Sequence, residues 1–178
     1  MLGSSFNIIG IDPGRNLGVA LFTIDSNTLD ILSIESTTYI LPAELFLTSR
    51  LSILHNIIDK YLNITNPIAV GIETAFAHRF PKAVMQLSQY TAVIEHTIYT
   101  YNNNIKMYRL PPTLIKTRIN KVVGGKATKD DMFAAVSAIE EITNKTNLIF
   151  KTEHEIDAIA IAYTMLQDIR QYPYYLIS

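Results

Sequence analysis

Two carboxylates and an imidazole–carboxylate pair are the residues of this sequence whose types and spacing suit chemistry. Asp12 ends an apolar run and precedes a Pro-Gly turn, and Glu73 ends a second apolar run. His154 and Asp157 stand three residues apart in a helical pattern, so they share one helix face. An isolated buried charge is very costly. Each acid must therefore be paired, hydrogen-bonded or bound to metal.

A cluster of these groups would suit divalent cations. Carboxylates at close range repel one another unless a cation lies between them. Oxygen-rich sites favour Mg²⁺ or Mn²⁺, and one imidazole shifts the preference towards Mn²⁺. Two such ions about 4 Å apart can activate water and stabilise the leaving oxygen of a phosphodiester. The sequence thus indicates metal-assisted hydrolysis as a candidate reaction.

Each residue also has a purely structural interpretation. Asp12 can cap the turn that follows it, Glu73 can precede a helix, and His154 can be an ordinary surface residue. Asp130 and Asp131 are better explained as first-turn acids that interact with a helix dipole. These alternatives remain open at the level of single residues.

The elements that would position these residues follow an order typical of an α/β protein. Three strands with short connections predict an antiparallel meander, and alternating helices and strands follow. The strands are expected at residues 6–12, 17–25, 29–39, 67–74 and 105–110, and the helices at 43–63, 81–102, 112–120, 128–142 and 153–169. Ligands of such sheets bind beyond the carboxyl ends of strands, so Asp12 and Glu73 share a site if their strands are neighbours.

The composition indicates one folded domain over residues 1–178. The chain is 48% hydrophobic and 17% charged, which is typical of a globular protein with a substantial core. The absence of cysteine excludes a disulfide framework and thiolate metal sites. Neither a signal peptide nor a stretch of about 20 apolar residues is recognisable. We therefore expect a cytoplasmic protein, in the host cytoplasm if it is viral, with no membrane partner.

Positive charge is concentrated in the middle of a chain whose net charge is −1. Residues 74–129 hold nine Lys or Arg residues and one acid, whereas the rest of the chain holds six basic and fifteen acidic residues. Such a segment suggests contact with a polyanion, and a basic solvated surface is the alternative. The members of this segment that we expect to contact such a polyanion are Arg79, Lys82, Lys116, Arg118, Lys121, Lys126 and Lys129.

Four ordered motifs between residues 7 and 165 resemble those of the RuvC family of Holliday-junction resolvases. They are IIGIDPGRNLGVAL, VGIETAFAHRFPKAVMQLSQYTAVI, LPPTLIKTRINKVVGGKATKDDMFAAV and HEIDAIAIA. GIDPG by itself would be weak, because sugar-kinase-like ATPases have comparable signatures, but four motifs in order are specific. The resemblance implies a ribonuclease H-like α/β fold. In that fold a five-stranded mixed sheet, made of a three-strand antiparallel meander plus parallel strands, is flanked by helices.

The resemblance also implies roles for individual residues. The family's metal ligands correspond to Asp12, Glu73, His154 and Asp157. The position of His154 is often aspartate in the family, so histidine is a departure that some members share. Phe76 corresponds to an aromatic residue that contacts junction bases, with a core phenylalanine as the alternative. Lys116 and Lys129 correspond to lysines near the scissile phosphate, where Lys129 would stabilise developing negative charge.

We therefore expect a metal-dependent, structure-specific DNA endonuclease that resolves four-way junctions and other branched DNA with two Mg²⁺ or Mn²⁺ ions per site. A homodimer is expected, because a junction has two symmetric strands to cut and a two-fold axis presents two identical sites. One alternative is a nuclease of the same fold that acts on RNA or RNA precursors, against which the basic KVVGGKATK segment argues. Another is a junction-binding protein without catalysis, against which the four plausible ligands argue.

Overall fold

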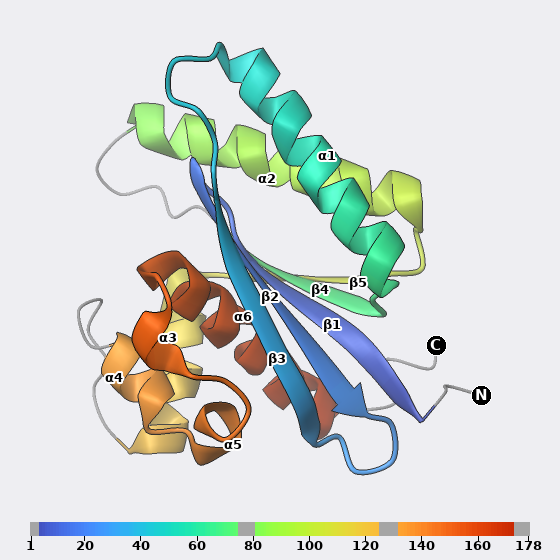
Figure 1. The fold of residues 1–178 in the computed structure, drawn as a ribbon, viewed down its shortest axis with the longest axis vertical. Helices are drawn as coiled ribbons and strands as arrows, with labels where there is room; N and C mark the ends of the chain where they lie inside the picture. The colour runs from blue at the N-terminus through green and yellow to red at the C-terminus, as the bar shows by residue number, and fades with distance from the viewer. Residues whose placement is uncertain (1–3, 75–80, 125–131, 173–178) are drawn as a thin grey trace.

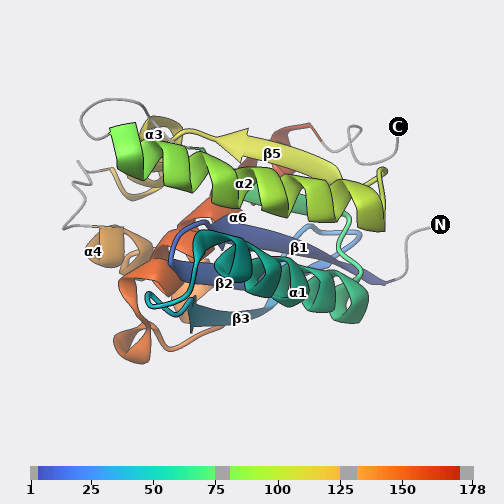
Figure 2. The same ribbon diagram turned by 90° about the horizontal axis from the view of Figure 1, so that it is seen from above.

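The computed structural model describes residues 4–74, 81–124 and 132–172, which form a five-stranded sheet between two layers of helices (Figures 1 and 2). The strands are β1 (Ser5–Asp12), β2 (Asn16–Asp25), β3 (Ile31–Ile40), β4 (Ala69–Glu73) and β5 (Lys106–Leu110). The helices are α1 (Leu47–Thr65), α2 (Pro81–Tyr101), α3 (Pro112–Val123), α4 (Met132–Ser137), α5 (Glu140–Thr143) and α6 (Glu153–Gln171), with the 3₁₀ turn η1 (Leu148–Phe150) before α6. The five expected strands are confirmed, and their ends shift by at most two residues. Among the described helices, none has the length and the hydropathy of a membrane span.

The strand order of the sheet is β3-β2-β1-β4-β5. β2 pairs antiparallel with both β1 and β3, whereas β4 pairs parallel with both β1 and β5. This arrangement confirms the predicted meander followed by parallel strands. It also makes neighbours of β1 and β4, the strands that end in Asp12 and Glu73.

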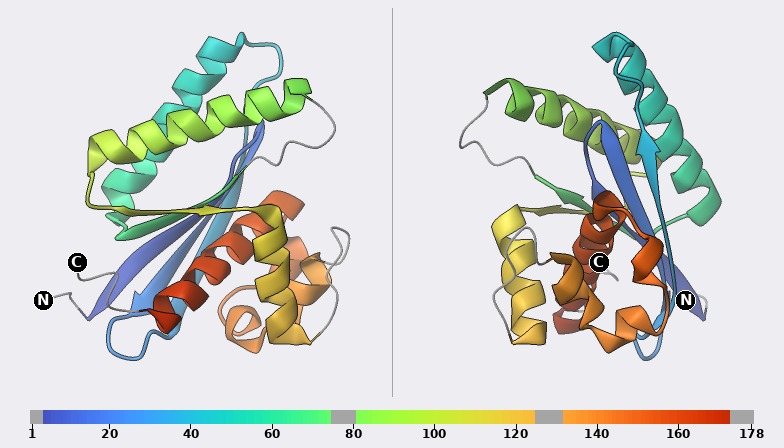
Figure 3. Two further views of the ribbon diagram at one scale, coloured as in Figure 1. Left: turned by 180° about the vertical axis from the view of Figure 1, so that it is seen from behind. Right: turned by 60° about the vertical axis from the view of Figure 1, so that its left-hand side comes forward.

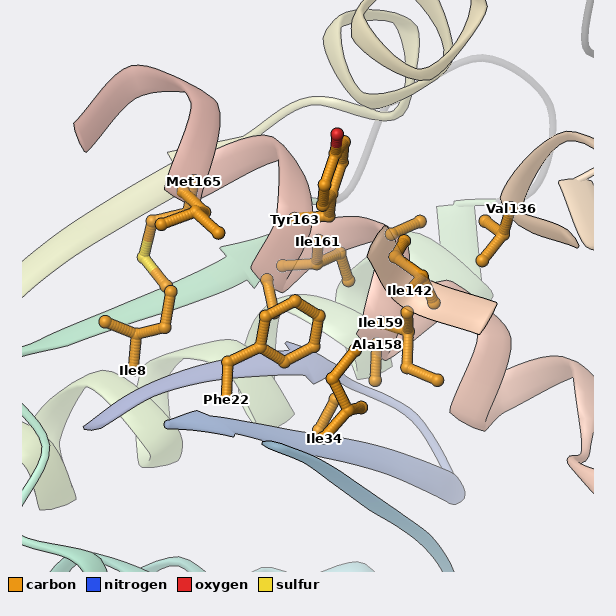
Figure 4. Close-up of a cluster of buried hydrophobic side chains, with 14 of the residues drawn as sticks. Ile8, Phe22, Ile34, Val136, Ile142, Ala158, Ile159, Ile161, Tyr163 and Met165 are labelled. Atoms are coloured by element: carbon orange, nitrogen blue, oxygen red, sulfur yellow. The ribbon is translucent and has the colours of Figure 1, made fainter. Parts of the chain in front are cut away.

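Each face of the sheet has its own apolar core. α1 and α2 cover one face (Figure 1), where Leu54 and Ile94 pack with Ile11. The other face is covered by α3, α4, α5 and α6 (Figure 3), and its core gathers Phe22 and the Ala-Ile run of α6 (Figure 4). Because strand side chains alternate between the two faces, a residue next to a core position on one face points to the other face.

The helix α6 lies unusually close to β1 and β2, because two glycines face it. A Cβ atom at Gly10 would lie 2.2 Å from the carbonyl oxygen of Ala158, and one at Gly18 would lie 2.0 Å from that of His154. These neighbours are backbone atoms, which cannot turn aside as a flexible side chain can. Gly18 also lies directly opposite Asp12 in the β1–β2 register. The start of α6 is thus held against the strand end that carries Asp12.

The N-terminus of α6 is fixed by a capping box. The Thr152 hydroxyl accepts a hydrogen bond from the Glu155 N–H at 3.2 Å, and Glu155 Oε2 accepts one from the Thr152 N–H at 3.1 Å. Glu155 Oε1 accepts from Ser36 of β3 at 3.0 Å and lies 3.1 Å from Lys151 Nζ. Burial acts to raise the pKa of Glu155, but these partners hold it below its ordinary value. The carboxylate therefore ties the helix start to β3.

The single helix predicted for residues 128–142 is wrong in its C-terminal part. α4 ends at Ser137 and α5 begins at Glu140, with Ile139 in an extended conformation between them. Residues 132–142 have helical apolar spacing, which explains the prediction. The break turns the chain towards β3, where Ile142 joins the same core as Ile34. Tertiary packing thus outweighs local helical preference here.

Candidate active site

The carboxyl ends of β1 and β4 bring two acids to one edge of the sheet. The parallel register pairs Ile11 with Ile72, so Asp12 and Glu73 are the next residues on adjacent strands. Ile11 and Ile72 both belong to the core under α1 and α2. By alternation, Asp12 and Glu73 point to the face that α6 covers. β1 and β4 are therefore neighbours, which was the condition for Asp12 and Glu73 to share a site.

The helix α6 places an imidazole against Asp12. His154 Nδ1 lies 2.8 Å from Asp12 Oδ2, and His154 Nε2 lies 3.1 Å from Nδ2 of Asn16 at the start of β2. The His154 and Asp12 side chains remain 25% and 17% exposed. A ligand can reach them, while reduced hydration strengthens the contact between them.

Asp157, one helical turn beyond His154, lies near Glu73. The two carboxylates line a common pocket of about 250 Å³ between the sheet edge, α3 and α4. The other lining residues are Pro112, Ile115, Lys116 and Met132. The pocket therefore combines two acids and one amine with apolar walls.

The four candidate ligands form two pairs in this structure. Asp12 contacts His154, and Glu73 shares the pocket with Asp157. Within residues 4–74, 81–124 and 132–172, no three His, Cys, Asp or Glu side chains are gathered closely enough to hold a metal ion. Three carboxylates and one imidazole nevertheless suit Mg²⁺ or Mn²⁺ in donor type, and all four lie at one edge of the sheet. In donor type, these residues fit a divalent cation.

The electrostatic surroundings of His154 favour its protonated form. The hydrogen bond to Asp12 is the main cause that raises the pKa of His154 above its ordinary value of 6.5. Burial opposes this shift, and the negative charges of Asp12, Glu153 and Asp157 add to it. Without metal, His154 and Asp12 therefore form an ion pair up to a pH above 6.5.

This ion pair predicts a pH-dependent stability in the absence of divalent ions. His154→Gln should lower the free energy of unfolding more at about pH 6 than at about pH 8. The folded-state pKa exceeds the unfolded value, so the stabilisation is complete below about 6.5 and is lost as the pH rises through the folded value. Urea unfolding of both proteins in EDTA measures the difference. A difference that does not shrink with rising pH would contradict the ion pair.

The sequence matches, over residues 8–165, the family model described as crossover junction endodeoxyribonuclease RuvC. The chain belongs to the RuvC family. The matched range contains Asp12, Glu73, His154 and Asp157. Membership makes this RuvC chain an endonuclease that resolves Holliday junctions, as its motifs predict.

Curated relatives and solved structures agree with the family. The RuvC of Fusobacterium nucleatum is 28% identical over 163 residues, which cover 91% of this chain and 80% of the relative. The RuvC of Halothermothrix orenii is 28% identical over 160 residues, covering 87% and 88%. Thermus thermophilus RuvC in complex with a Holliday junction substrate superposes with a TM-score of 0.69 at 18% identity, covering 93% of this chain and 96% of that one. The yeast mitochondrial Holliday junction resolvase Ydc2 gives a TM-score of 0.66 at 14% identity, covering 95% and 84%. These likenesses confirm the ribonuclease H-like fold.

The basic residues predicted to contact DNA lie in different places in this RuvC chain. Lys116 lines the pocket of Glu73 and Asp157. Arg118 and Lys121 line a separate groove between α3 and the C-terminal part of α6, and Arg118 Nη2 lies 2.6 Å from an Asp168 oxygen. The structure therefore brings Lys116, and not these two residues, to the acidic pocket. Phe76, Arg79, Lys126 and Lys129 lie outside the described residues, as does the side chain of Lys82.

Three residues that shape this RuvC site were missed by sequence reasoning. The Thr-x-x-Glu spacing that ends at Glu155 is a capping-box signature and could have fixed the start of α6. Gly18 could have been found by aligning the β1–β2 hairpin, which sets it opposite Asp12. No sequence signal points to Asn16, because its contact with His154 joins residues 138 positions apart.

Proposed function

We propose that this RuvC chain cuts four-way DNA junctions with divalent ions held by Asp12, Glu73, His154 and Asp157. The observation that carries the proposal is the contact of His154 with Asp12 at the sheet edge where Glu73 and Asp157 share a pocket. Mg²⁺ or Mn²⁺, two ions per site, would supply an activated water and neutralise charge on the leaving oxygen. We expect a 5′-phosphate and a 3′-hydroxyl as products. A cytoplasmic location is part of the proposal, because DNA lies in the cytoplasm of bacteria such as those of the curated relatives.

The contribution of the chain is to hold these groups on rigid elements before the substrate arrives. Asp12 and Glu73 follow fully buried strand residues, so their backbones are fixed by the sheet. His154 and Asp157 belong to the helix that Gly18 allows onto β2. Sites built on helices and strands are more precisely placed than sites on loops. This arrangement supports catalysis rather than binding alone.

Histidine at position 154 predicts a distinctive metal and pH dependence. An imidazole binds metal only when neutral, and the pKa of His154 is raised by Asp12, so protons compete with Mn²⁺ for the ring. At subsaturating Mn²⁺, cleavage should fall as the pH drops through a midpoint above about 6.5. His154→Asp should stay active, prefer Mg²⁺ and extend activity to lower pH. Superimposable pH–rate profiles for the two proteins in each metal would show that His154 is not a ligand.

Lys116 is proposed to contact a DNA phosphate beside the acidic pocket. Lys116→Ala should weaken junction binding and make the plot of log affinity against log salt shallower by about 0.9, because one phosphate contact is lost. Lys60→Ala is the control, since Lys60 is an exposed residue of α1 on the opposite face of the sheet. Fluorescence anisotropy over a salt series measures both slopes. An unchanged slope for Lys116→Ala would remove this lysine from the DNA path.

A homodimer is the proposed assembly, because one junction offers two symmetric strands. α2 buries Ile94 and Ile98 against the sheet but leaves Met85 and Tyr99 each 61% exposed. These apolar side chains support a contact between the α2 helices of two copies. Light scattering of wild type and Met85→Lys/Tyr99→Lys tests it: we expect a dimer for wild type and a monomer for the variant. A wild-type monomer at working concentration would contradict the proposal.

A further inference from the structure

The imidazole of His154 is held at both nitrogens, and only one of its two partners is a candidate metal ligand. Nδ1 lies 2.8 Å from Asp12 Oδ2, and Nε2 lies 3.1 Å from the side-chain amide of Asn16. Glu153 also approaches Nε2, but its Oε1 is 3.6 Å away and its side chain is 78% exposed. Asn16 is therefore the residue that fixes the Nε2 side of the ring.

Asn16 is itself firmly placed. It is the first residue of β2, its Cα is paired with Ile40 of β3, and the fully buried Leu17 follows it. Just before it, the Arg15 carbonyl oxygen accepts a hydrogen bond from the Leu41 N–H at 2.7 Å. The sheet, and not a free loop, thus carries the amide, so the contact with His154 is built into the strand meander.

A side-chain amide can serve either form of an imidazole nitrogen. The Asn16 NH₂ group donates to an unprotonated Nε2, in which case Nδ1 carries the ring proton and donates it to Asp12. Half a turn of the amide presents Oδ1 instead, which accepts from a protonated Nε2. In a neutral ring Nδ1 is then the unprotonated nitrogen, and it faces Asp12. The exchange changes no charge on Asn16 and moves no backbone.

We propose that Asn16 is a positioning residue that makes Nδ1 of His154 the nitrogen available to a divalent cation shared with Asp12. The inference rests on the proposed function, because it takes Asp12 and His154 as ligands. A histidine that binds metal through one nitrogen almost always donates its other N–H to an oxygen, which fixes the ring orientation and the tautomer. In this structure Nδ2 of Asn16 faces Nε2, and after the half turn of the amide Oδ1 would be that acceptor, with Asp12 on the side left to the cation.

Nitrogen-15 histidine spectra of the full-length protein assign the two nitrogens directly, with the His154 signal identified by its loss in His154→Gln. At a pH high enough for a neutral ring, we expect metal-free wild type to carry the proton on Nδ1, and Mg²⁺ to move it to Nε2. Asn16→Leu has a similar size but no amide, and it should lose the preference for one form. No response of wild-type His154 to Mg²⁺ would count against the proposed ligand set. A wild-type response that Asn16→Leu reproduces would overturn only the role of Asn16.

Mn²⁺ affinity of the DNA-free protein, measured by calorimetry, separates positioning from packing. Asn16→Leu should bind Mn²⁺ about tenfold more weakly, as expected when a metal-binding histidine loses its second partner. Asn16→Asp keeps an acceptor oxygen and should bind as tightly as wild type or more tightly. Asn27→Leu is the matched control, because Asn27 is an exposed residue in the turn after β2 and should leave the affinity unchanged. Equal losses in Asn16→Leu and Asn16→Asp would overturn the proposal.

Discussion

Asp12→Asn is expected to abolish junction cleavage and to leave junction binding largely intact. The change keeps the size of the side chain but removes the charge that would hold a cation and that pairs with His154. We expect a single-turnover rate on the order of a thousandfold lower, which corresponds to about 4 kcal/mol in the barrier. Gel-based cleavage of a labelled four-way junction measures the rate, and a gel-shift assay in Ca²⁺ measures binding.

Asp30→Asn is the control for this experiment. It makes the same chemical change at an exposed acid just before β3, at the opposite end of the β2–β3 pair from Asn16. This variant should cut at the wild-type rate. Near-normal cleavage by Asp12→Asn would show that Asp12 is no ligand and that its role is confined to the turn that follows it.

Gly18→Ala is expected to displace the start of α6 and to remove activity together with stability. The added Cβ would lie 2.0 Å from the His154 carbonyl oxygen and 2.7 Å from its carbonyl carbon, so β2 or α6 must move. Overpacking against backbone should cost about 3 kcal/mol of unfolding free energy. His154 should lose its contact with Asp12. Urea unfolding and junction cleavage measure the two effects.

Gly71→Ala is the matched control for Gly18→Ala. A Cβ at Gly71 of β4 would meet Ile161 Cγ2 at 3.1 Å and Met165 Sδ at 3.4 Å, and these side-chain atoms can adjust. We expect a loss of about 1 kcal/mol and retained cleavage. Failure of Gly18→Ala to fold beside a folded Gly71→Ala would support the close approach of α6. A Gly18→Ala protein with wild-type stability and activity would contradict it.

The sheet and the placement of the two strand-end acids were predictable from local patterns. Apolar runs and β-branched alternation define the strands, and the short connections of the first three imply the meander. Asp12 and Glu73 each stand where such a run ends. That Asp12 and Glu73 lie side by side was predicted only on condition that β1 and β4 pair, because strand order is set by contacts between distant segments.

The detailed form of the site was not predictable, because it depends on how α6 lies on the sheet. The four expected ligands are at one edge, but they form two pairs rather than one cluster. The close approach that brings His154 to Asp12 depends on Gly18, and the hairpin register that sets this glycine opposite Asp12 does not by itself show that a helix packs on it. The hydrogen bond of Asn16 likewise arises from tertiary packing.

Charge counting identified a basic segment but could not separate its members. Lys116 reaches the acidic pocket, whereas Arg118 is engaged by Asp168 in another groove. The sequence places Lys116 and Arg118 two residues apart in one predicted helix and Asp168 in another. Spacing alone does not show which basic side chain is already held by an opposite charge. The contacts of the remaining basic residues stay predictions.

One measurement tests most directly the claim that this site cuts branched DNA by metal-dependent hydrolysis. The protein is incubated with labelled four-way junction, flap, linear duplex and RNA–DNA hybrid, each with Mg²⁺, with Mn²⁺ or with EDTA. We predict paired cuts in the two symmetric strands of the four-way junction, faster in Mn²⁺ than in Mg²⁺, none in EDTA, and little or no cutting of duplex or hybrid. Preferential cutting of the hybrid, or a junction that is bound but uncut in both metals, would contradict the account.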